Sequence, residues 1–557
     1  MTDHDVSEAV LSIADMVRAR ANDDNVAVRF GSQSWTYREW VQCCADRASL
    51  WDSFRDPNRP PNIGVLLDNV PDFTMWLGAA ALSGSTVVGI NPTRRGTELA
   101  ADIAHTECQI VVTESTYRRL LAGLDLGIAP ENHFDIDSGS YADLLAAHRG
   151  ATLPAEPVAA DSIFLLLFTS GTSGSPKAVI CTNGRLVFVS QMMVGGVTLT
   201  GDDVTYISMP LFHSNALFTA WAPSVLVGAT VALRRKFSAS EFLADVRRFS
   251  ATYFNYVGKP LAYILATPEQ VDDAENPLTR GFGNEANDAD IARFSKRFGC
   301  RLIDGYGQTE TGASIVRVPD MPIGALGIGA PTVKVLDPLT GNECPPARFD
   351  TGGRLLNASE AIGEITNSAS SGFEGYWNNP EANAQRVRNG TYFTGDLAYR
   401  DSAGFFYFAG RNADWIRVDG ENFAAAPVER ILARFPGVVL GAVYGVPDPV
   451  AGDRVMATFQ LTDGASFDPE AFASFLTGQS DLGSKWSPSF VRVTASLPTT
   501  ATNKVLKRQL VRERWETAEP VWIRTAPATY RRFTSDDLNA LNAAFEANGR
   551  RSLLGEA

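Results

Sequence analysis

The sequence predicts an α/β fold, with a large N-terminal domain of parallel or mixed sheets covered by helices and a small, mobile α+β domain after it. Short apolar runs alternate with helical patterns in the first third of the chain, which is typical of parallel sheets. The pattern changes near Gly410, where shorter strands and helices begin. A length of 557 residues also favours more than one domain.

The first domain shows its strands as short apolar runs rich in Val, Ile and Leu. We predict buried strands at 62–67, 86–90, 109–113 and 163–168, and helices between them at 73–82 and 95–106. Two longer uncharged stretches, 76–92 and 216–233, contain Gly, Ser or Pro and are marginal in length for a membrane span. Each is therefore predicted to be a buried helix followed by a buried strand.

The second part of the chain starts after a hairpin predicted at 401–409, where a turn precedes aromatic alternation. A hinge is predicted at 410–414. Beyond it we expect helices at 426–434 and 469–476 and strands at 438–446 and 454–461. The resulting domain boundaries are 1–410, 411–519 and a C-terminal extension at 520–557.

Composition excludes several classes of protein. The net charge of −14 argues against a nucleic-acid binder, and the basic run 234–236 is expected to be a solvated surface turn. Six cysteines without a CxxC pair and five scattered histidines favour neither a disulfide framework nor a zinc site. The acidic, polar N-terminus is not a secretory signal, so a cytoplasmic location is expected; peripheral membrane contact stays open.

Residues 169–177, Thr-Ser-Gly-Thr-Ser-Gly-Ser-Pro-Lys, follow a predicted strand. Glycines let the backbone approach a ligand, and hydroxyl and N–H groups donate to phosphate oxygens. A flexible surface loop is the simpler interpretation of such a composition alone, but the preceding strand and Lys177 favour a phosphate loop. It lacks the Gly-Lys-Ser/Thr ending of a Walker loop.

This segment resembles the phosphate loop of the adenylate-forming superfamily, which includes acyl-CoA synthetases, luciferases and peptide-synthetase adenylation domains. Further segments resemble that family's motifs in the family's order: 305–310 (GYGQTE), 375–380 (GYWNNP), 392–397 (YFTGDL), 410–411 with 419–422, and 500–505 (TATNKV). Asn503, Ala413 and Ala178 depart from the residues usual at their positions. The resemblance spans residues 163 to about 510.

The resemblance implies a role for each candidate residue. Lys504, Thr309 and Glu310 would be catalytic, with Glu310 also holding Mg²⁺, and His213 would line the acyl site rather than act as acid or base. The nucleotide and CoA would be held by Thr169, Ser170, Gly171, Thr172, Ser173, Gly174 and Lys177 at the phosphates, by Gly283, Asn284, Glu285, Asp304 and Tyr306 around adenine, by Asp396 and Arg411 at the ribose, and by Gly420 in the thiol tunnel.

Residues 411–422 and 254–261 resemble the fatty-acid transport and very-long-chain branch of acyl-CoA synthetases. The implied function is an ATP-dependent acyl-CoA ligase for a large apolar acid, either a long-chain fatty acid or a steroid side-chain acid. The implied cofactors and co-substrates are ATP, Mg²⁺ and coenzyme A. An acyl-AMP ligase that loads a carrier protein and a membrane-associated uptake protein with weak catalysis are the alternatives. The oligomeric state stays open.

Overall fold

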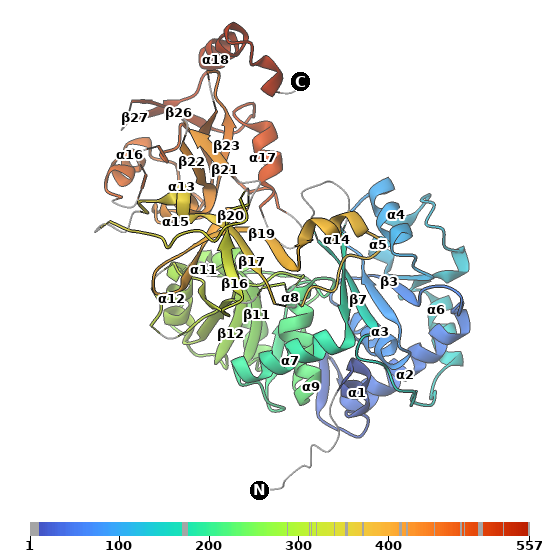
Figure 1. The fold of residues 1–557 in the computed structure, drawn as a ribbon. Helices are drawn as coiled ribbons and strands as arrows, with labels where there is room; N and C mark the ends of the chain where they lie inside the picture. The colour runs from blue at the N-terminus through green and yellow to red at the C-terminus, as the bar shows by residue number, and fades with distance from the viewer. Residues whose placement is uncertain are drawn as a thin grey trace. The chain divides into compact units, whose positions relative to one another are not determined.

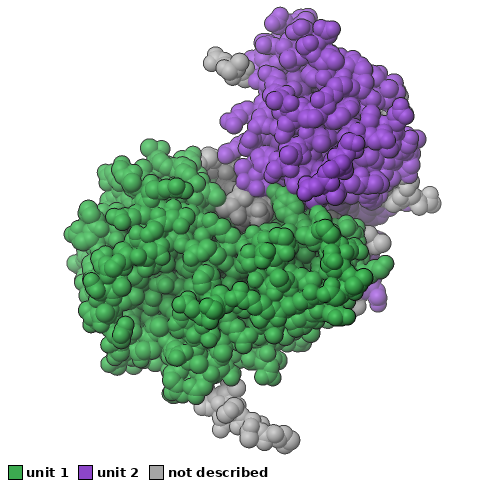
Figure 2. Space-filling view, turned by 180° about the vertical axis from the view of Figure 1, so that it is seen from behind, with its two compact units in different colours: residues 1–311, 371–386 green, residues 312–370, 387–557 purple. Residues whose placement is uncertain are grey.

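The computed structural model describes the chain except for residues 1–10, 170–176, 287, 311, 314, 319, 323, 339, 351–354, 370–371, 412–414, 419–420, 451, 480–481, 484, 500–504, 527–528 and 555–557. The fold divides into two compact units (Figure 2). Unit 1 comprises Met1–Thr311 and Ser371–Arg386, and unit 2 comprises Gly312–Ser370 and Val387–Ala557. The predicted α/β fold, with parallel and mixed sheets flanked by helices, is confirmed (Figure 1).

The first sheet of unit 1 contains the predicted N-terminal strands. Its order is β6 (His133–Asp135), β5 (Ile110–Thr113), β3 (Asn62–Leu66), β4 (Thr86–Gly89), β7 (Ile163–Thr169) and β8 (Lys177–Thr182). All neighbours are parallel except β7 and β8, which form an antiparallel pair. The helices α3 (Pro71–Leu82) and α4 (Gly96–His105) lie where the apolar periodicity predicts them. Because the central strands are buried on both faces, their sequences are continuous apolar runs.

The second sheet of unit 1 carries several candidate residues at its strand ends. Its order is β13 (Arg301–Asp304), β12 (Arg280–Asn284), β11 (Tyr253–Val257), β9 (Val204–Ile207), β10 (Thr230–Leu233), β1 (Val26–Phe30) and β2 (Gln33–Thr36). The strands β9 to β13 are parallel. The loops that follow β11, β12 and β13 therefore emerge at one edge of the sheet, where ligands of α/β proteins bind.

The uncharged stretch 216–233 forms a buried helix and strand, as predicted. A π-helical turn, Leu217–Trp221, continues into α9 (Ala222–Val227), and β10 follows. Pro223 lies near the start of α9, directly after the π-helical turn. Within the described part of the chain, every helix is too short or too polar to cross a bilayer.

Within the basic run 234–236, Arg235 and Lys236 are exposed and lie in a bend, as expected of a surface turn, and both also form ion pairs that the sequence did not predict. Arg235 lies 2.5 Å from Glu114 and 3.4 Å from Asp68, and Lys236 lies 3.3 Å from Asp68. Both carboxylates are buried, at the ends of β5 and β3, whereas Arg235 follows β10. The run therefore connects the two sheets of unit 1 by ion pairs.

Unit 2 contains two larger sheets. In the first, β19 (Thr391–Arg400) and β20 (Phe405–Arg411) form the predicted hairpin, beside β17 (Gly363–Asn367), β16 (Val333–Leu336), β15 (Gly327–Gly329) and β14 (Ile315–Val316). The second has the order β23 (Val438–Pro447), β24 (Asp453–Leu461), β25 (Phe490–Thr494), β26 (Val521–Ala526) and β27 (Thr529–Arg532).

A core of aromatic and aliphatic side chains joins this second sheet to α15 (Ala425–Leu432) and α16 (Pro469–Thr477). Tyr530, from the segment predicted as a C-terminal extension, belongs to that core. The same segment supplies β26 and β27, and α18 (Ser535–Ala547) follows them. The domain boundaries at 410 and 519 remain predictions, and Gly410 itself lies within β20.

Candidate active site

The hairpin of β7 and β8 brackets the phosphate-loop motif. Thr169 and Lys177 face each other in register across the pair, so the two ends of the motif lie side by side. The predicted residues Ser170 to Gly174 lie outside the described residues. Lys177 is only 8% exposed, and its pKa lies below the ordinary lysine range, mainly because of burial and also because of Arg386; Glu310 acts in the opposite direction.

The motif at 375–380 runs along the outer edge of β8. Ile180 donates its N–H to the carbonyl of Gly375 at 3.0 Å, and Trp377 donates to the carbonyl of Ala178 at 2.8 Å. Gly375 has a φ of +105°, a conformation that favours glycine. The motif then enters α14 (Pro380–Arg386), with proline in the first position. These backbone hydrogen bonds fix Tyr376 beside β8.

Tyr376 connects the candidate magnesium ligand to two basic side chains. Its hydroxyl donates to Oε1 of Glu310 at 2.9 Å and accepts from Nε of Arg386 at 3.1 Å. The ammonium of Lys177 lies 5.4 Å from the centre of its ring. Glu310 is 6% exposed and Tyr376 is 1% exposed, and burial raises the pKa of the Tyr376 hydroxyl. This buried cluster joins two of the sequence-predicted residues, Lys177 and Glu310.

Thr309 is held from two directions. The hydroxyl oxygens of Thr309 and Ser214 are 2.8 Å apart, and a guanidinium nitrogen of Arg185 donates to the carbonyl of Thr309. Arg185 also donates to the carbonyl of Ile180 at 2.8 Å and lies 3.7 Å from the carboxylate of Glu374. The Thr309–Glu310 dipeptide is therefore fixed to β8 and to the 371–386 segment.

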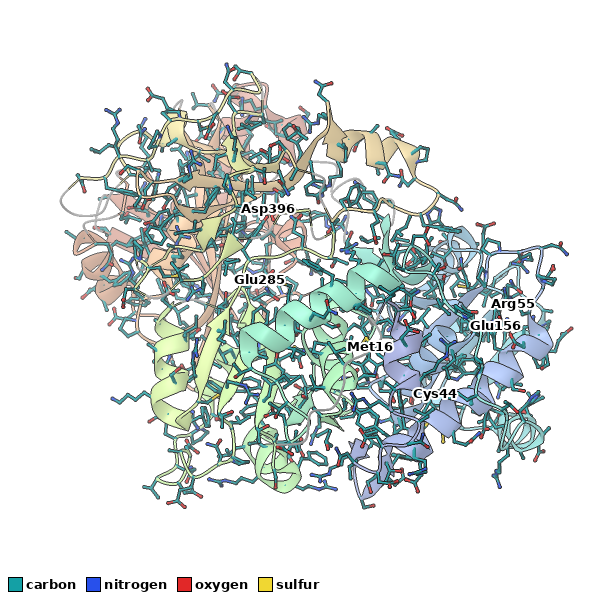
Figure 3. The ribbon with its side chains drawn as sticks, turned by 60° about the horizontal axis from the view of Figure 1, so that its bottom comes forward. Met16, Cys44, Arg55, Glu156, Glu285 and Asp396 are labelled. Atoms are coloured by element: carbon teal, nitrogen blue, oxygen red, sulfur yellow. The ribbon has the colours of Figure 1, made fainter. Side chains whose placement is uncertain are left out.

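The ends of β12 and β13 lie close together. Gly283 pairs with Asp304 in register, and a Cβ on Gly283 would lie 2.4 Å from the ring of Tyr256. The carboxylate of Asp304 accepts from the N–H of Ala286 at 3.1 Å. Glu285, labelled in Figure 3, follows β12 with a φ of +68°. Residues predicted around adenine therefore lie together at the ends of β12 and β13, and their contact with a nucleotide base stays a prediction.

A chain of amides crosses this region. Asn255 donates to Asn215 at 2.7 Å, Asn215 donates to Asn284 at 3.1 Å, and Asn284 donates to the carbonyl of Gly305 at 2.6 Å. The chain links the helix that begins at Ser214 to the loop before Tyr306. His213 precedes this helix and is half-buried, with its ring 4.2 Å from that of Phe212.

In unit 2, Asp396 lies on β19 and is 4% exposed. Its backbone faces that of Arg411 on β20, and Thr394 accepts from its N–H at 3.1 Å. Gly395 has a φ of +76° and donates to the buried Glu364 at 2.6 Å. The motif at 392–397 therefore forms an irregular, well-bonded strand that presents one buried carboxylate.

Two predicted residues of unit 2 lie outside the described residues. Gly420 falls between β21 (Trp415–Val418) and β22 (Glu421–Ala424), which pair as a hairpin. Lys504 falls between Thr499 and Val505, which form an isolated bridge. Their roles stay predictions. Four side chains that contact the candidate residues were not predicted as site residues: Tyr376, Arg185, Ser214 and Glu374. Two of them carried a signal, since Tyr376 lies in the motif at 375–380 and Ser214 directly follows His213.

The described side chains suit a magnesium nucleotide better than a metal held by protein alone. No group of three His, Cys, Asp or Glu side chains within the described residues could enclose a metal ion. Glu310 supplies one buried carboxylate beside a lysine, which matches a Mg²⁺ ion shared between one protein ligand and substrate phosphates. Residues Glu310 and Thr309 would hold such an ion and its phosphates.

Comparison with known families gives two matches along the chain. The model described as "AMP-binding enzyme" matches residues 16–377, and the one described as "AMP-binding enzyme C-terminal domain" matches residues 427–504. The first model covers well over half of the sequence. Both segments follow each other in the order that the motifs indicate.

Two curated relatives match nearly the whole chain. A steroid-22-oyl-CoA synthetase of Rhodococcus jostii is 49% identical over 98% of this chain and 99% of its own length. A medium/long-chain-fatty-acid–CoA ligase, FadD17, of Mycobacterium marinum is 48% identical over 87% of this chain and 94% of its own.

Among solved structures, an anthranilate–CoA ligase bound to anthranoyl-AMP has a TM-score of 0.78 at 20% identity, covering 90% of this chain and 97% of its own. ATP-bound MatB of Rhodopseudomonas palustris has a TM-score of 0.77 at 24% identity, covering 90% and 98%. At these identities the two structures support the fold alone.

Proposed function

The chain belongs to the AMP-binding enzyme family and is an acyl-CoA synthetase of the AMP-forming type; from that premise we propose that it activates a large apolar carboxylic acid. The observation that carries the proposal is the near-complete match to two relatives that are named for a steroid acid and for medium or long fatty acids. Both named substrates combine one carboxylate with a bulky apolar body, and that shared chemistry defines the proposed class.

The proposed reaction has two steps. The carboxylate first attacks the α-phosphate of ATP, which forms acyl-AMP and releases pyrophosphate. The CoA thiolate then attacks the acyl carbonyl, which forms the thioester and releases AMP. In both steps negative charge moves next to the α-phosphate: in the first it passes from the carboxylate to the departing pyrophosphate, and in the second it passes from the thiolate through the carbonyl oxygen to the phosphate of the departing AMP. One set of phosphate-binding residues can therefore serve both steps.

In unit 1, the proposed roles follow from the buried cluster. Lys177 carries a desolvated positive charge at the end of the phosphate-loop motif, which suits it to hold a phosphate oxygen. Thr309, fixed by Ser214 and Arg185, offers its hydroxyl to the α-phosphate. Glu310 would hold Mg²⁺, which supplies charge neutralisation for the phosphates when it is bound. His213 lies next to Phe212 and would form part of the wall for the acyl group.

In unit 2, Asp396 and Arg411 would bind the ribose, Lys504 would neutralise charge in the first step, and Gly420 would leave room for pantetheine in the second. The proposed exchange of these two loops requires rotation about residues 410–414. Domain rotations of this kind are a recognised way to give one site two sets of catalytic groups. The predicted boundary at 410 is part of this proposal.

The test is a panel of acids assayed for AMP release that depends on both ATP and CoA. We expect a steroid-22-oic acid or a fatty acid of twelve or more carbons to exceed acetate in kcat/KM by several orders of magnitude, because each buried CH₂ contributes about 0.8 kcal/mol. Equal kcat/KM for acetate and the large acids would contradict the proposed substrate class.

The same assay separates the alternatives. An acyl-AMP ligase for a carrier protein would release pyrophosphate but would form no thioester with free CoA. An uptake protein with weak catalysis would bind the acid without appreciable AMP release. We also propose a cytoplasmic location for the enzyme, where peripheral contact with a membrane would give it access to apolar acids.

A further inference from the structure

We propose that Tyr376 is a positioning residue that keeps the Glu310 carboxylate oriented and available for Mg²⁺–ATP, an inference that rests on the function proposed above. The tyrosine touches no reacting atom in this proposal. It acts through Glu310, to which its hydroxyl donates at 2.9 Å. Glu310 and Tyr376 are 66 residues apart in sequence, and the contact depends on the return of the 371–386 segment to unit 1.

Tyr376 is held rigidly, so its hydroxyl has a defined place. Its neighbours Gly375 and Trp377 bond to the β8 backbone, and its own N–H donates to Asn383 at 2.7 Å. Its ring packs with Val179 and Ala382, and the ring of Phe373 lies 5.1 Å away. Because the ring is 1% exposed, water does not compete for the Glu310 contact.

The same tyrosine keeps two cations from pairing directly with Glu310. Arg386 donates to the tyrosine oxygen at 3.1 Å, and Lys177 lies over the ring at 5.4 Å from its centre. Within the described residues, no lysine or arginine lies at ion-pair distance from Glu310, and the interaction between Lys177 and Glu310 acts through space. A direct Arg–Glu pair would satisfy the carboxylate and compete with a divalent cation. A neutral hydroxyl donor orients one oxygen and leaves the negative charge for the metal.

The contact with Arg386 also sets the direction of the tyrosine O–H bond. A guanidinium that donates to the phenolic oxygen occupies one of its lone pairs, so the remaining O–H is directed at Glu310. The chain Arg386–Tyr376–Glu310 is thus ordered from donor to acceptor. Cooperative polarisation along such a chain strengthens the last hydrogen bond.

The experiment compares metal binding in the wild-type full chain and in Tyr376→Phe, which removes one oxygen atom and keeps the ring. Free Mn²⁺ is titrated by electron paramagnetic resonance against enzyme saturated with ATP, and ATP binding is measured separately in EDTA by calorimetry. We expect the Mn²⁺ affinity of the enzyme–ATP complex to fall roughly tenfold, as for loss of one hydrogen bond to a charged group, whereas ATP binding without metal changes less than twofold.

Tyr206→Phe is the matched control. Tyr206 is also 1% exposed, its hydroxyl donates to Asp245 at 3.0 Å, and Arg234 pairs with that carboxylate at 2.8 Å. We expect this variant to keep the wild-type Mn²⁺ affinity. Equal losses in Tyr376→Phe with and without metal, or an unchanged Mn²⁺ affinity, would overturn the inference. Failure of the wild-type chain to bind ATP with Mn²⁺ would instead overturn the proposed function.

The variant Arg386→Gln provides a second test of the positioning role. It remains informative even if Tyr376→Phe does not fold. If Arg386 acted only by its charge, its removal would strengthen Mn²⁺ binding, because a competing cation would be gone. The positioning role predicts the opposite sign, a roughly threefold weakening, because the tyrosine O–H is no longer directed at Glu310. A strengthened affinity in Arg386→Gln would therefore contradict the proposal.

Discussion

The hydroxyl oxygens of Ser214 and Thr309 lie 2.8 Å apart, which fixes the candidate α-phosphate contact to the residue directly after His213. We expect Ser214→Ala to lower the rate of adenylation roughly three- to tenfold, since the freed Thr309 hydroxyl can adopt other rotamers. Pyrophosphate exchange measures this step. Ser190→Ala is the control, because the buried Ser190 donates to a helix carbonyl at 2.7 Å; a similar loss there would indicate a general packing effect.

Asp396→Asn keeps the size of the side chain and removes its charge. If Asp396 accepts from the ribose hydroxyls, the variant should raise the KM for ATP at least tenfold, which corresponds to the roughly 1.5–3 kcal/mol of a hydrogen bond to a charged group. Steady-state kinetics at saturating acid and CoA provide the measurement. Asp401→Asn, in the β19–β20 turn, should leave this KM unchanged. An unaltered KM in Asp396→Asn would exclude the ribose role.

Lys504→Ala should abolish adenylation while sparing thioester formation from preformed acyl-AMP. Loss of one such charged donor typically costs about 10²–10³ in rate. Lys507 is not a suitable control, because it pairs with Glu429 at 2.9 Å; the exposed Arg508 serves instead as Arg508→Ala. If both half-reactions slow equally in Lys504→Ala, the two-state model of the C-terminal loops is incorrect.

Gly420→Leu should show the reverse pattern. A branched side chain between β21 and β22 would fill the proposed thiol tunnel, so thioester formation should fall at least tenfold and pyrophosphate exchange should persist. A turn glycine with only a structural role would give equal losses in the two half-reactions, and circular dichroism would register the damage to the fold.

Lys259 destabilises the folded protein near neutral pH, and this effect should be lost as the pH rises. Burial lowers the pKa of Lys259 to about 8. At pH 7 the lysine is therefore charged in both states, but its charge is partly desolvated in the folded state and fully solvated in the unfolded state. This penalty disappears as pH rises from about 8 towards the unfolded value near 10.5. Lys259→Met should therefore stabilise the protein at pH 7 by about 1 kcal/mol after allowance for solvent screening, or roughly 1–2 °C in Tm.

The stabilising effect of Lys259→Met should fade above pH 9. Differential scanning fluorimetry of variant and wild type at each pH gives the difference directly, with the exposed Lys296→Met as control. A constant difference from pH 7 to 10 would show that the titration of Lys259 is not coupled to folding.

The sequence was most informative where one local pattern determines the structure. The strands at 62–66, 86–89, 110–113 and 163–169 end within two residues of their predicted bounds, because a strand buried on both faces must be apolar throughout. Glu310 was singled out by the resemblance of 305–310 to a family motif, and its burial became known only from the structure. Whether Glu310 binds metal remains a prediction.

Contacts between distant segments were not predictable in this way. Nothing in the run 234–236 indicates that Arg235 meets Glu114, since that pair depends on the order of β10, β5 and their sheets. The contact between Tyr376 and Glu310 was also not predictable, although the motif that contains Tyr376 was recognised. Local patterns report what a residue's own element requires, whereas these pairings arise only when two elements far apart in sequence are brought together.

The position of the 371–386 segment along β8 has a consequence for biosynthesis. In the order β6-β5-β3-β4-β7-β8, strand β8 is the last, and its outer backbone groups at Ala178 and Ile180 are occupied by Gly375 and Trp377. During synthesis from the N-terminus, these groups stay open until the ribosome has passed Trp377. Nascent chains therefore display an unprotected strand edge for much of translation, and this interval is when they are most exposed to pairing with one another.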